Sequence, residues 1–414
     1  MQLLELNDLQ LRWFTSTGAI VRQPGAALIE DDTVVYGESA LKRSRLAPRG
    51  FQDQHWQLLN SDSLALSAPG VKNNADLIYR HLQALAELAA QQSPPSQPLI
   101  CAVPGTVSSD QLGLLMGIAQ EAGIAIGSFA NSALLYALNE PLPAQSWCID
   151  IQNRHAILTE LKKDNNALTA LNSVELPLLG MSGLIDSWLD LLVDQFVARS
   201  RFDPLRVAET EQQLFDQVRS WRADQGTFSA TVDHQNSQRE VSLSFDEISD
   251  RAQQRYRSTQ DRLPTRSTVV LTPTASALPG FSTYLSAAGH TVINASEDAP
   301  LVNALATKAL THPEAVHLLS SLATTTATLA SAADNIHATH ALAGHIAVPL
   351  ARLAETMATL AGSAAAGFHV TAASENVRIN GEATASSTPL RPGDALQVTD
   401  TTYTCIRVND GPAA

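Results

Sequence analysis

Short apolar runs alternate with amphipathic stretches over the first three quarters of the chain, as is typical of strands followed by helices. The clearest example spans residues 99–138. Leu99–Val103 is a continuous apolar run ended by a proline and a glycine, which is expected of a buried strand. Ser108 or Ser109 can cap the helix that follows, and Gly123 stands where a left-handed C-cap belongs. Because a second strand and a second helix come next, the pattern predicts an α/β fold.

The rest of the chain divides by the same criteria. Residues 51–70 show no clear period, and we expect a loop with short elements there. In order, the pattern predicts a strand at Leu3–Phe14, a hairpin at residues 27–36, helices at Asn74–Gln92 and 184–196, hairpins at 146–160 and Phe228–Leu243, a helix at Phe245–Arg257, and two further strand–helix pairs between 268 and 310.

The composition changes after residue 311. Residues 312–335 are rich in Ala, Ser and Thr, which is compatible with a helix or a linker. From residue 336 to 410, short runs are separated by Gly, Pro and Asn-Gly signals, which predict a small all-β domain.

Charge and hydropathy exclude several function classes. The formal net charge is −14, which argues against nucleic acid as the main partner, because phosphate binding needs a basic surface. No apolar run reaches the ~18 residues that span a bilayer, so no membrane insertion is expected. The N-terminus lacks a basic leader, which favours a cytoplasmic location. The three cysteines lie far apart, without metal-ligand spacing, and we interpret them as core residues.

Three segments carry a resemblance to a known family. Residues 103–111, VPGTVSSDQ, residues 24–44, PGAALIEDDTVVYGESALKRS, and residues 179–196, LGMSGLIDSWLDLLVDQF, occur in this order. They resemble segments of the bacterial DnaK-type heat-shock chaperones, whose ATPase has the actin-like fold. The resemblance implies a two-lobed, actin-like nucleotide-binding-domain fold, with lobe I at residues 1–145 and lobe II at 146–311.

The family's two phosphate-binding turns are rich in glycine, because side chains would block the approach of phosphate to the backbone amides. The resemblance aligns these turns with residues 4–11 and 150–157. Glu5 takes the place of an aspartate, Asn7 that of a glycine, and Asn153 that of another glycine, whereas Asp150 keeps the first acid of the second turn.

Two further positions align with the family's adenosine side. Thr272, followed by a proline, replaces a glycine-rich turn, and Arg219 resembles one residue of the adenine-side helix. The resemblance therefore implies a vestigial nucleotide cleft made of Glu5, Asn7, Asp150, Asn153, Arg219 and Thr272.

Because larger side chains replace glycine in the two phosphate-binding turns, we favour a catalytically silent pseudo-ATPase. It would act as a protein-interaction or scaffolding module, with an unidentified protein partner. We expect no metal and no cofactor. Two alternatives stay open: a divergent ATPase that uses Glu5 and Asp150 on Mg²⁺-ATP, and an actin-related adaptor of pilus or division-type assembly.

Each candidate residue also has a structural interpretation. Asp150 could be a strand-end acid in a structural hydrogen bond, and Glu5 and Asp8 are more typical of a solvated turn than of a metal site. Arg154 and His155 could bind an anion or could form an exposed hairpin tip. A metal shared by the spaced histidines, His337, His340 and His345, is not expected, because neighbours three apart on a strand point to opposite faces.

The end of the β domain carries a second resemblance. Residues 377–382, VRINGE, then 390–394, LRPGD, then 403–408, YTCIRV, resemble the last part of forkhead-associated domains. That family's phosphothreonine-binding elements, an Arg after a Gly and a Ser-x-x-His, are not evident. Gly362-Ser363 and Phe368-His369 are a poor substitute for them.

Overall fold

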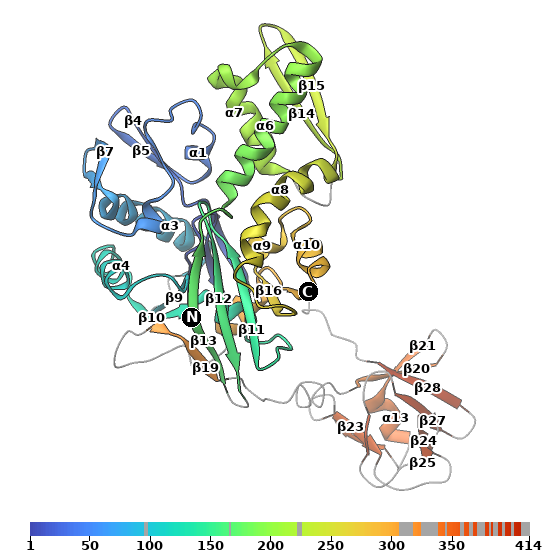
Figure 1. Ribbon diagram of the computed structural model, residues 1–414. Helices are drawn as coiled ribbons and strands as arrows, with labels where there is room; N and C mark the ends of the chain where they lie inside the picture. Colours follow the sequence, from blue (N-terminus) through green and yellow to red (C-terminus); the bar gives the residue numbers. More distant parts are fainter. Residues whose placement is uncertain are drawn as a thin grey trace. The chain divides into compact units, whose positions relative to one another are not determined.

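The computed structural model contains two compact units, residues 1–324 and 325–414 (Figure 1). The first is mixed α/β and the second is rich in strands, so the predicted α/β part followed by a small β part is confirmed. The structure describes residues 1–94, 98–164, 167–221, 226–305, 318–323, 338–343, 346–356, 360–363, 367–370, 377–380, 382–383, 388–390, 394–398 and 401–406.

Two six-stranded sheets form the centre of the first unit. The first has the order β18-β10-β9-β1-β2-β3 and the second the order β17-β16-β11-β12-β13-β19. The strands of the first sheet are β1 (Gln2–Glu5), β2 (Leu11–Thr15), β3 (Gly18–Gln23), β9 (Leu99–Val103), β10 (Ile126–Asn131) and β18 (Leu318–Leu319). Those of the second are β11 (Gln145–Ile151), β12 (Ala156–Lys163), β13 (Ala167–Leu176), β16 (Thr268–Leu271), β17 (Thr291–Asn294) and β19 (Ser321–Ala323).

The two sheets repeat one topology. In each, three consecutive strands pair antiparallel through hairpins, and the first of them pairs in parallel with a later strand, β1 with β9 and β11 with β16. Parallel neighbours need a crossover connection. The helices α4 (Ser109–Glu121), between β9 and β10, and α9 (Pro273–Ser276) with α10 (Phe281–Ala287), between β16 and β17, lie in two such crossovers. We call residues 1–138 the first half of this unit and residues 145–305 the second half.

Each half carries an additional group of elements between its hairpins and its first parallel crossover strand. In the first half these are β4 (Ala27–Glu30), β5 (Thr33–Tyr36), α1 (Glu38–Leu41), β6 (Phe51–Gln52), α2 (His55–Leu58), β7 (Ser63–Ala68), β8 (Val71–Asn73) and α3 (Asn74–Gln92). In the second half they are α6 (Met181–Ser200), η1 (Pro204–Arg206), α7 (Ala208–Ser220), β14 (Phe228–His234), β15 (Ser237–Leu243) and α8 (Phe245–Gln260).

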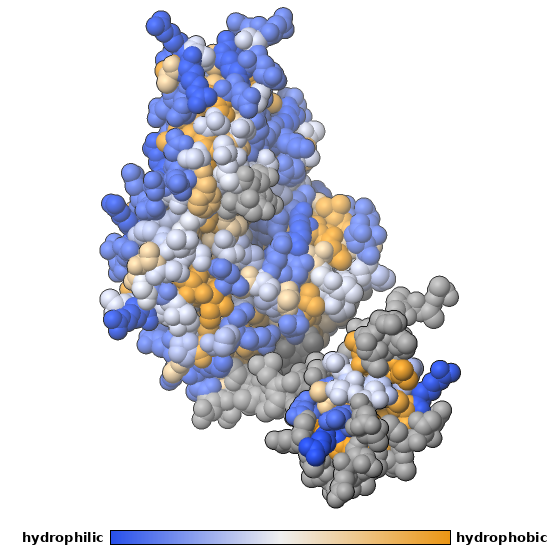
Figure 2. All heavy atoms as spheres, turned by 90° about the vertical axis from the view of Figure 1, so that its right-hand side faces the viewer, coloured by the Kyte–Doolittle hydropathy of each residue, from blue (hydrophilic) through white to orange (hydrophobic). Residues whose placement is uncertain are grey.

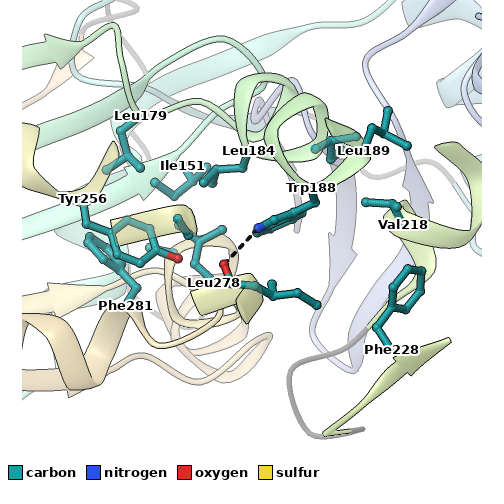
Figure 3. Close-up of a cluster of buried hydrophobic side chains, with 14 of the residues drawn as sticks. Ile151, Leu179, Leu184, Trp188, Leu189, Val218, Phe228, Tyr256, Leu278 and Phe281 are labelled. Carbon is teal, nitrogen blue, oxygen red and sulfur yellow. Dashed lines mark hydrogen bonds between the residues drawn. The ribbon is translucent and has the colours of Figure 1, made fainter. Parts of the chain in front are cut away.

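The largest hydrophobic core belongs to the second half. It joins the sheet to the additional helices, and Trp188 on α6 lies near its centre (Figure 3). The Trp188 indole N–H donates to the Ile248 carbonyl at 3.2 Å, which satisfies the one polar atom of this buried side chain. The core therefore fixes α6 against α8.

Local signals around residues 99–138 are confirmed. All of β9 is buried, as expected for a central parallel strand. Ser108 is the N-cap of α4 and forms a capping box with Gln111, and Gly123 has φ 75°, which a glycine adopts without strain.

Two predicted elements differ from the structure. The strand predicted at Leu3–Phe14 is wrong, because residues 6–10 turn the chain and divide it into the β1–β2 hairpin. Within the predicted linker or helix at 312–335, residues 318–319 and 321–323 form β18 and β19, since each finds a free sheet edge. The remainder of that segment lies outside the described residues. So do residues 306–310 of the last predicted helix, which begins as α11 (Ala299–Leu305).

The second unit has two sheets, β21-β20-β28-β27-β24-β25 and β22-β23-β26. Its core includes Leu350, Phe368 and Leu396. A helix, α13, also occurs, because Leu350, Leu353 and Ala354 follow a helical rather than a strand period. The other elements are β20 (His340–Ala343), β21 (Ile346–Pro349), α13 (Leu350–Thr356), β22 (Leu360–Ser363), β23 (Gly367–Val370), β24 (Val377–Ile379), β25 (Glu382–Ala383), β26 (Thr388–Pro389), β27 (Ala395–Val398) and β28 (Thr401–Ile406).

Asn380 connects two strands of this unit and gives a first prediction. Its side chain donates to Asp394 at 2.9 Å and accepts from the Ala395 amide at 2.9 Å, while its φ is 55°. We expect Asn380→Ala to destabilise the second unit by about 1–3 kcal/mol, because it leaves the Ala395 amide without this acceptor and places alanine in the left-handed region. Hydrogen exchange of the Ala395 amide in the full chain should accelerate. Asn380→Gly, which tolerates the backbone but lacks the side chain, should show an intermediate effect, and equal exchange in all three proteins would contradict the prediction.

The surface and the cysteines agree with the composition. The face drawn in Figure 2 is mainly hydrophilic, with small hydrophobic patches between polar side chains. Cys101, Cys148 and Cys405 are free and buried, so their interpretation as core residues is confirmed. In the part of the chain that the structure describes, no helix is both long and apolar enough to cross a bilayer.

Candidate functional site

Two hairpin turns, one from each half of the first unit, contact each other. Residues 6–10 connect β1 to β2, and residues 152–155 connect β11 to β12. The Asn7 side-chain amide donates to both Asp150 carboxylate oxygens, at 3.2 and 3.1 Å, and to the Ile151 carbonyl at 3.0 Å. The turns that the resemblance selects are therefore joined directly by side chains.

Side chains also occupy the backbone amides of both turns. The Asp8 amide donates to Gln152 Oε1 at 3.1 Å, and the Asn153 amide donates to Asp8 Oδ1 at 2.7 Å. The Leu9 amide donates to Asn7 Oδ1 at 2.9 Å. Amides of this kind bind phosphate in turns where they are free. We name Asn7, Asp8, Asp150, Gln152 and Asn153 the turn clasp.

Asp150 lies at the centre of the clasp and is 8% exposed. Its Oδ1 accepts hydrogen bonds from the Thr272 and Thr274 hydroxyls, at 2.7 and 2.9 Å, and its Oδ2 accepts from the Gln152 side chain at 2.5 Å. Burial raises the pKa of Asp150 to about 6, with hydrogen bonds from Thr272, Thr274 and Gln152 opposing it and the charge of Glu5 adding to it. Four donors, counting Asn7, surround this carboxylate, so it lacks a free coordination position for a metal ion.

Glu5 is held within the first half. It is 3% exposed, and its carboxylate accepts from Arg12 at 2.6 Å on one oxygen and from the Tyr136 hydroxyl at 2.6 Å on the other. Arg12 also contacts that hydroxyl. The interpretation of Glu5 and Asp8 as a solvated turn is therefore wrong, since both are buried by partners that are distant in the sequence.

Asp8 combines a structural hydrogen bond with an unpaired oxygen. Its Oδ2 is buried and has no hydrogen-bond partner among the described residues. Burial raises its pKa to about 7, the Asn153 amide and Arg154 lower it, and the charges of Asp53 and Asp150 raise it further. Burial thus favours the protonated form of this acid over a pH range in which an ordinary aspartate is ionised.

The raised pKa of Asp8 predicts a pH-dependent contribution to stability. Since the folded value, about 7, exceeds the ordinary 3.8, the contribution is complete below pH 3.8 and is lost as pH rises through 7. Relative to Asp8→Asn, the wild type should lose on the order of 2 kcal/mol of unfolding free energy between pH 5 and 7. Urea denaturation of both proteins at each pH measures the difference, and a difference that stays constant over this range would contradict the assignment.

Asp53 completes the contact between the halves, although the sequence offered no signal for it. It follows β6 and accepts from the Asn153 side chain at 2.8 Å and from Arg154 at 2.9 and 2.8 Å. Arg154 is thus a partner of Asp53, and His155, 4% exposed, lies in the interior rather than at an exposed tip. Gln152 and Thr274 were missed for the same reason, because only the folded chain brings them to Asp150.

The second turn is supported from behind by α6. The Met181 and Ser182 amides donate to the Gln152 and Asn153 carbonyls at 3.1 and 2.9 Å. A Cβ at Gly180 would lie 2.2 Å from the Arg154 carbonyl carbon, so only glycine permits this approach. The N-terminal amides of α6 are therefore also used within the protein.

Arg219 lies outside the turn clasp, although it lines one cleft together with Asn153. It lies on α7 and pairs with Glu38 on α1, with nitrogen–oxygen distances of 3.0 and 3.3 Å, which lowers the pKa of Glu38. The sequence-predicted residues thus divide: Asn7, Asp150, Asn153 and Thr272 come together, while Glu5 and Arg219 have separate partners.

A cleft of about 1170 Å³ extends between the turn clasp and the α1–α7 contact. Its lining includes, from the two halves, Asp8, Glu38, Arg45, Phe51, Asp53, Asn153, Arg154, Met181, Ile185, Asp186, Trp188, Phe215, Arg219, Trp221, Thr274 and Leu278. Over the described part of the chain, no group of three or more His, Cys, Asp or Glu side chains is arranged to hold a metal ion. His340 is a strand residue near Thr339, and His337 and His345 lie outside the described residues.

No protein-family model matches this chain, and a search of curated proteins also found no match.

Proposed function

We propose that the first unit is a catalytically silent, actin-like relative of the DnaK-type ATPases, and that it acts as a protein-interaction or scaffolding module. Two observations support the fold part of this proposal. The two sheets share one strand order, and the turns at the ends of their first hairpins contact each other beside a cleft that both halves line. Two similar lobes around such a cleft are what the resemblance implies.

One observation carries the functional part: the backbone amides of Asp8, Leu9 and Asn153 already have side-chain acceptors in the turn clasp. A phosphate group would have to break these hydrogen bonds and displace the Asn7, Asp8 and Gln152 side chains. Each hydrogen bond that is lost costs about 1 kcal/mol, more for those to charged groups. The four donors around Asp150 would also have to be removed before this carboxylate could bind the water shell of Mg²⁺.

The second unit suits the same role. Its strand order, with one six-stranded and one three-stranded sheet, supports a forkhead-associated-like β domain as part of the proposal. Phe368, which belongs to a poor substitute for that family's phosphothreonine-binding elements, is 1% exposed and packs in the core. The cytoplasmic location and the protein partner remain predictions.

Calorimetric titration of the full chain with Mg-ATP and Mg-ADP tests this function. We expect no binding heat at millimolar nucleotide, and no shift in a parallel thermal melt, because a ligand bound to the native state would raise the melting temperature. Asn7→Gly with Gln152→Gly is the matched variant, since it frees the Asp8 and Leu9 amides and should bind nucleotide better than the wild type.

Micromolar binding by the wild type would overturn the proposal. Hydrolysis by the wild type but not by Asp150→Ala would favour a divergent ATPase instead, and nucleotide-dependent polymers would favour an actin-related adaptor.

A further inference from the structure

We infer that the first unit stays in one closed arrangement without any ligand, because side-chain bridges join its halves at the positions on either side of the cleft. This inference rests on the proposed function, since it assigns to the protein's own side chains the bridging role that bound phosphate has in a working ATPase. It adds a conformational property that the absence of nucleotide binding alone does not require.

The first bridge is the turn clasp together with the Asp53–Arg154 pair. It contains hydrogen bonds in both directions, from Asn7 to Asp150 and from the Asn153 amide to Asp8. Because most of these groups are buried, separating the turns would leave several hydrogen-bond donors without their acceptors at once. The turn clasp is therefore cooperative and weakly screened by salt, unlike the exposed Arg154 side chain.

The second bridge, which we call the outer latch, joins the additional elements of the two halves. Gln212 on α7 is 5% exposed, and its side chain accepts from the Arg45 amide at 2.8 Å and donates to the Leu41 carbonyl at 3.0 Å. The oxygen and the nitrogen of this buried side-chain amide thus both form hydrogen bonds to the first half. Opening the latch would leave this amide without these partners, which costs more than the hydrogen bonds contribute when formed.

Charged side chains flank this amide on both sides. Arg45 pairs with Asp186 and Glu211 at 3.0 and 3.2 Å, and Arg219 pairs with Glu38. The two guanidinium groups also lie 4.6 and 5.5 Å from the centroid of the Phe215 ring. Exposed ion pairs contribute little singly, but here both arginines pack on one aromatic ring, so the pairs act as a network.

A third connection joins the two sheets. Within six residues, β18 pairs in parallel with β10 of the first sheet and β19 pairs antiparallel with β13 of the second. The halves are thus linked by the turn clasp, by the outer latch and by this shared segment. Three separate connections oppose the relative motion of the halves that a nucleotide would have to close, and they present the surfaces of both halves to a partner in a fixed arrangement.

Distance measurement between spin labels tests the inference directly. Ser67→Cys on β7 and Ser237→Cys at the start of β15 provide exposed labelling positions, one in each half. The native cysteines are at most 1% exposed, so they should not react. By double electron–electron resonance, we expect a single narrow distance distribution in the full chain, unchanged by millimolar Mg-ATP. A broad distribution that narrows when Mg-ATP is added would overturn the inference.

A latch variant shows whether the named side chains are responsible. Arg45→Ala, Gln212→Ala and Arg219→Ala combined should shift the distribution to longer distances, with a thermal melt to verify folding. Arg206→Ala with Arg262→Ala removes the same charge from exposed positions and should leave the distribution as in the wild type. A folded latch variant with the wild-type distribution would contradict the latch.

The two proposals can fail separately. Binding heat on titration with nucleotide, together with an unchanged narrow distance distribution, would contradict the silent-ATPase function and leave the closed arrangement intact. A broad distance distribution in a protein that binds no nucleotide would contradict the closed arrangement and leave the silent-ATPase function intact.

Discussion

Replacing Asp150 with alanine is expected to lower the free energy of unfolding by about 3–5 kcal/mol. The reason is the set of donors around this carboxylate: the hydroxyls of Thr272 and Thr274 and the side-chain amides of Asn7 and Gln152. Alanine removes the carboxylate acceptor from all four and leaves Asn7 only the Ile151 carbonyl. Urea denaturation at pH 7, compared with the wild type, measures the loss.

The sign of this effect separates two roles for Asp150. An acid kept for binding a metal in an otherwise empty site destabilises the metal-free protein, so its removal commonly leaves stability unchanged or raises it. A structural acceptor behaves in the opposite way. A stability of Asp150→Ala equal to or above that of the wild type would therefore contradict the structural role and support the metal-binding alternative.

Asp150→Asn provides the matched comparison. The amide retains one oxygen for the two threonine hydroxyls, but its nitrogen would face the donors on Asn7 and Gln152. Because burial raises the pKa of Asp150 to about 6, removing its charge also relieves part of the burial penalty at pH 7. We expect stability to decrease in the order wild type, Asn, Ala. Asp190→Ala, at an exposed position on α6, should change the stability by no more than a typical surface substitution.

Features governed by neighbours in the sequence were predictable. The capping box at Ser108 and the left-handed Gly123 depend on residues within a few positions, and both occur as expected. The meeting of Asn7, Asp150 and Thr272 followed from the resemblance, which supplied the order of elements that local patterns lack. Their hydrogen bonds, with Thr272 donating to Asp150, could not be read from it.

Features governed by distant contacts were not predictable. Asp53 lies in a segment without period, and its role depends on Asn153 and Arg154, one hundred residues later. Glu5 looked like a turn acid because its partner Tyr136 is equally remote. The segment at 318–323 has a composition that suits a helix or linker, yet two sheet edges determine its conformation.

Acidification is expected to destabilise the first unit through a pair of buried histidines. His55 on α2 and His81 on α3 are 1% and 0% exposed, and His55 Nε2 lies 3.2 Å from His81 Nδ1. The Trp56 indole, which can only donate, also contacts His81 Nδ1 at 3.1 Å. His81 Nδ1 must therefore be the acceptor, so His81 Nε2 donates to Gln23 at 3.2 Å and His55 donates from Nε2.

A further proton on either ring would have no hydrogen-bond acceptor among the described residues. The remaining nitrogen, His55 Nδ1, is buried and has no hydrogen-bond partner among the described residues, and Tyr36 stacks on His81 at a ring distance of 4.6 Å. Burial lowers the pKa of His55 to about 3 and, together with the neighbouring His55, lowers that of His81 well below its usual range. Both rings are consequently neutral in the folded state at every physiological pH.

The sign of the linkage follows from these directions. Because the folded pKa of His55 is below its ordinary 6.5, the unfolded chain takes up the proton first as pH falls. The contribution is complete above pH 6.5 and is lost as pH falls toward 3. Relative to His55→Phe, which keeps an aromatic ring and lacks the titrating group, the wild type should lose about 2–3 kcal/mol between pH 6.5 and 4.5.

Trp56→Phe is the control for this prediction. It removes one donor to His81 but keeps both histidines, so it should be less stable than the wild type at all pH values with the same acid dependence. Urea denaturation of the three proteins from pH 8 to 4.5 gives the comparison, and taking differences from the wild type cancels the opposite pH dependence of Asp8 and Asp150. A difference between wild type and His55→Phe that did not change with pH would mean that the folded protein takes up the proton as readily as the unfolded chain, which would contradict a buried, neutral His55.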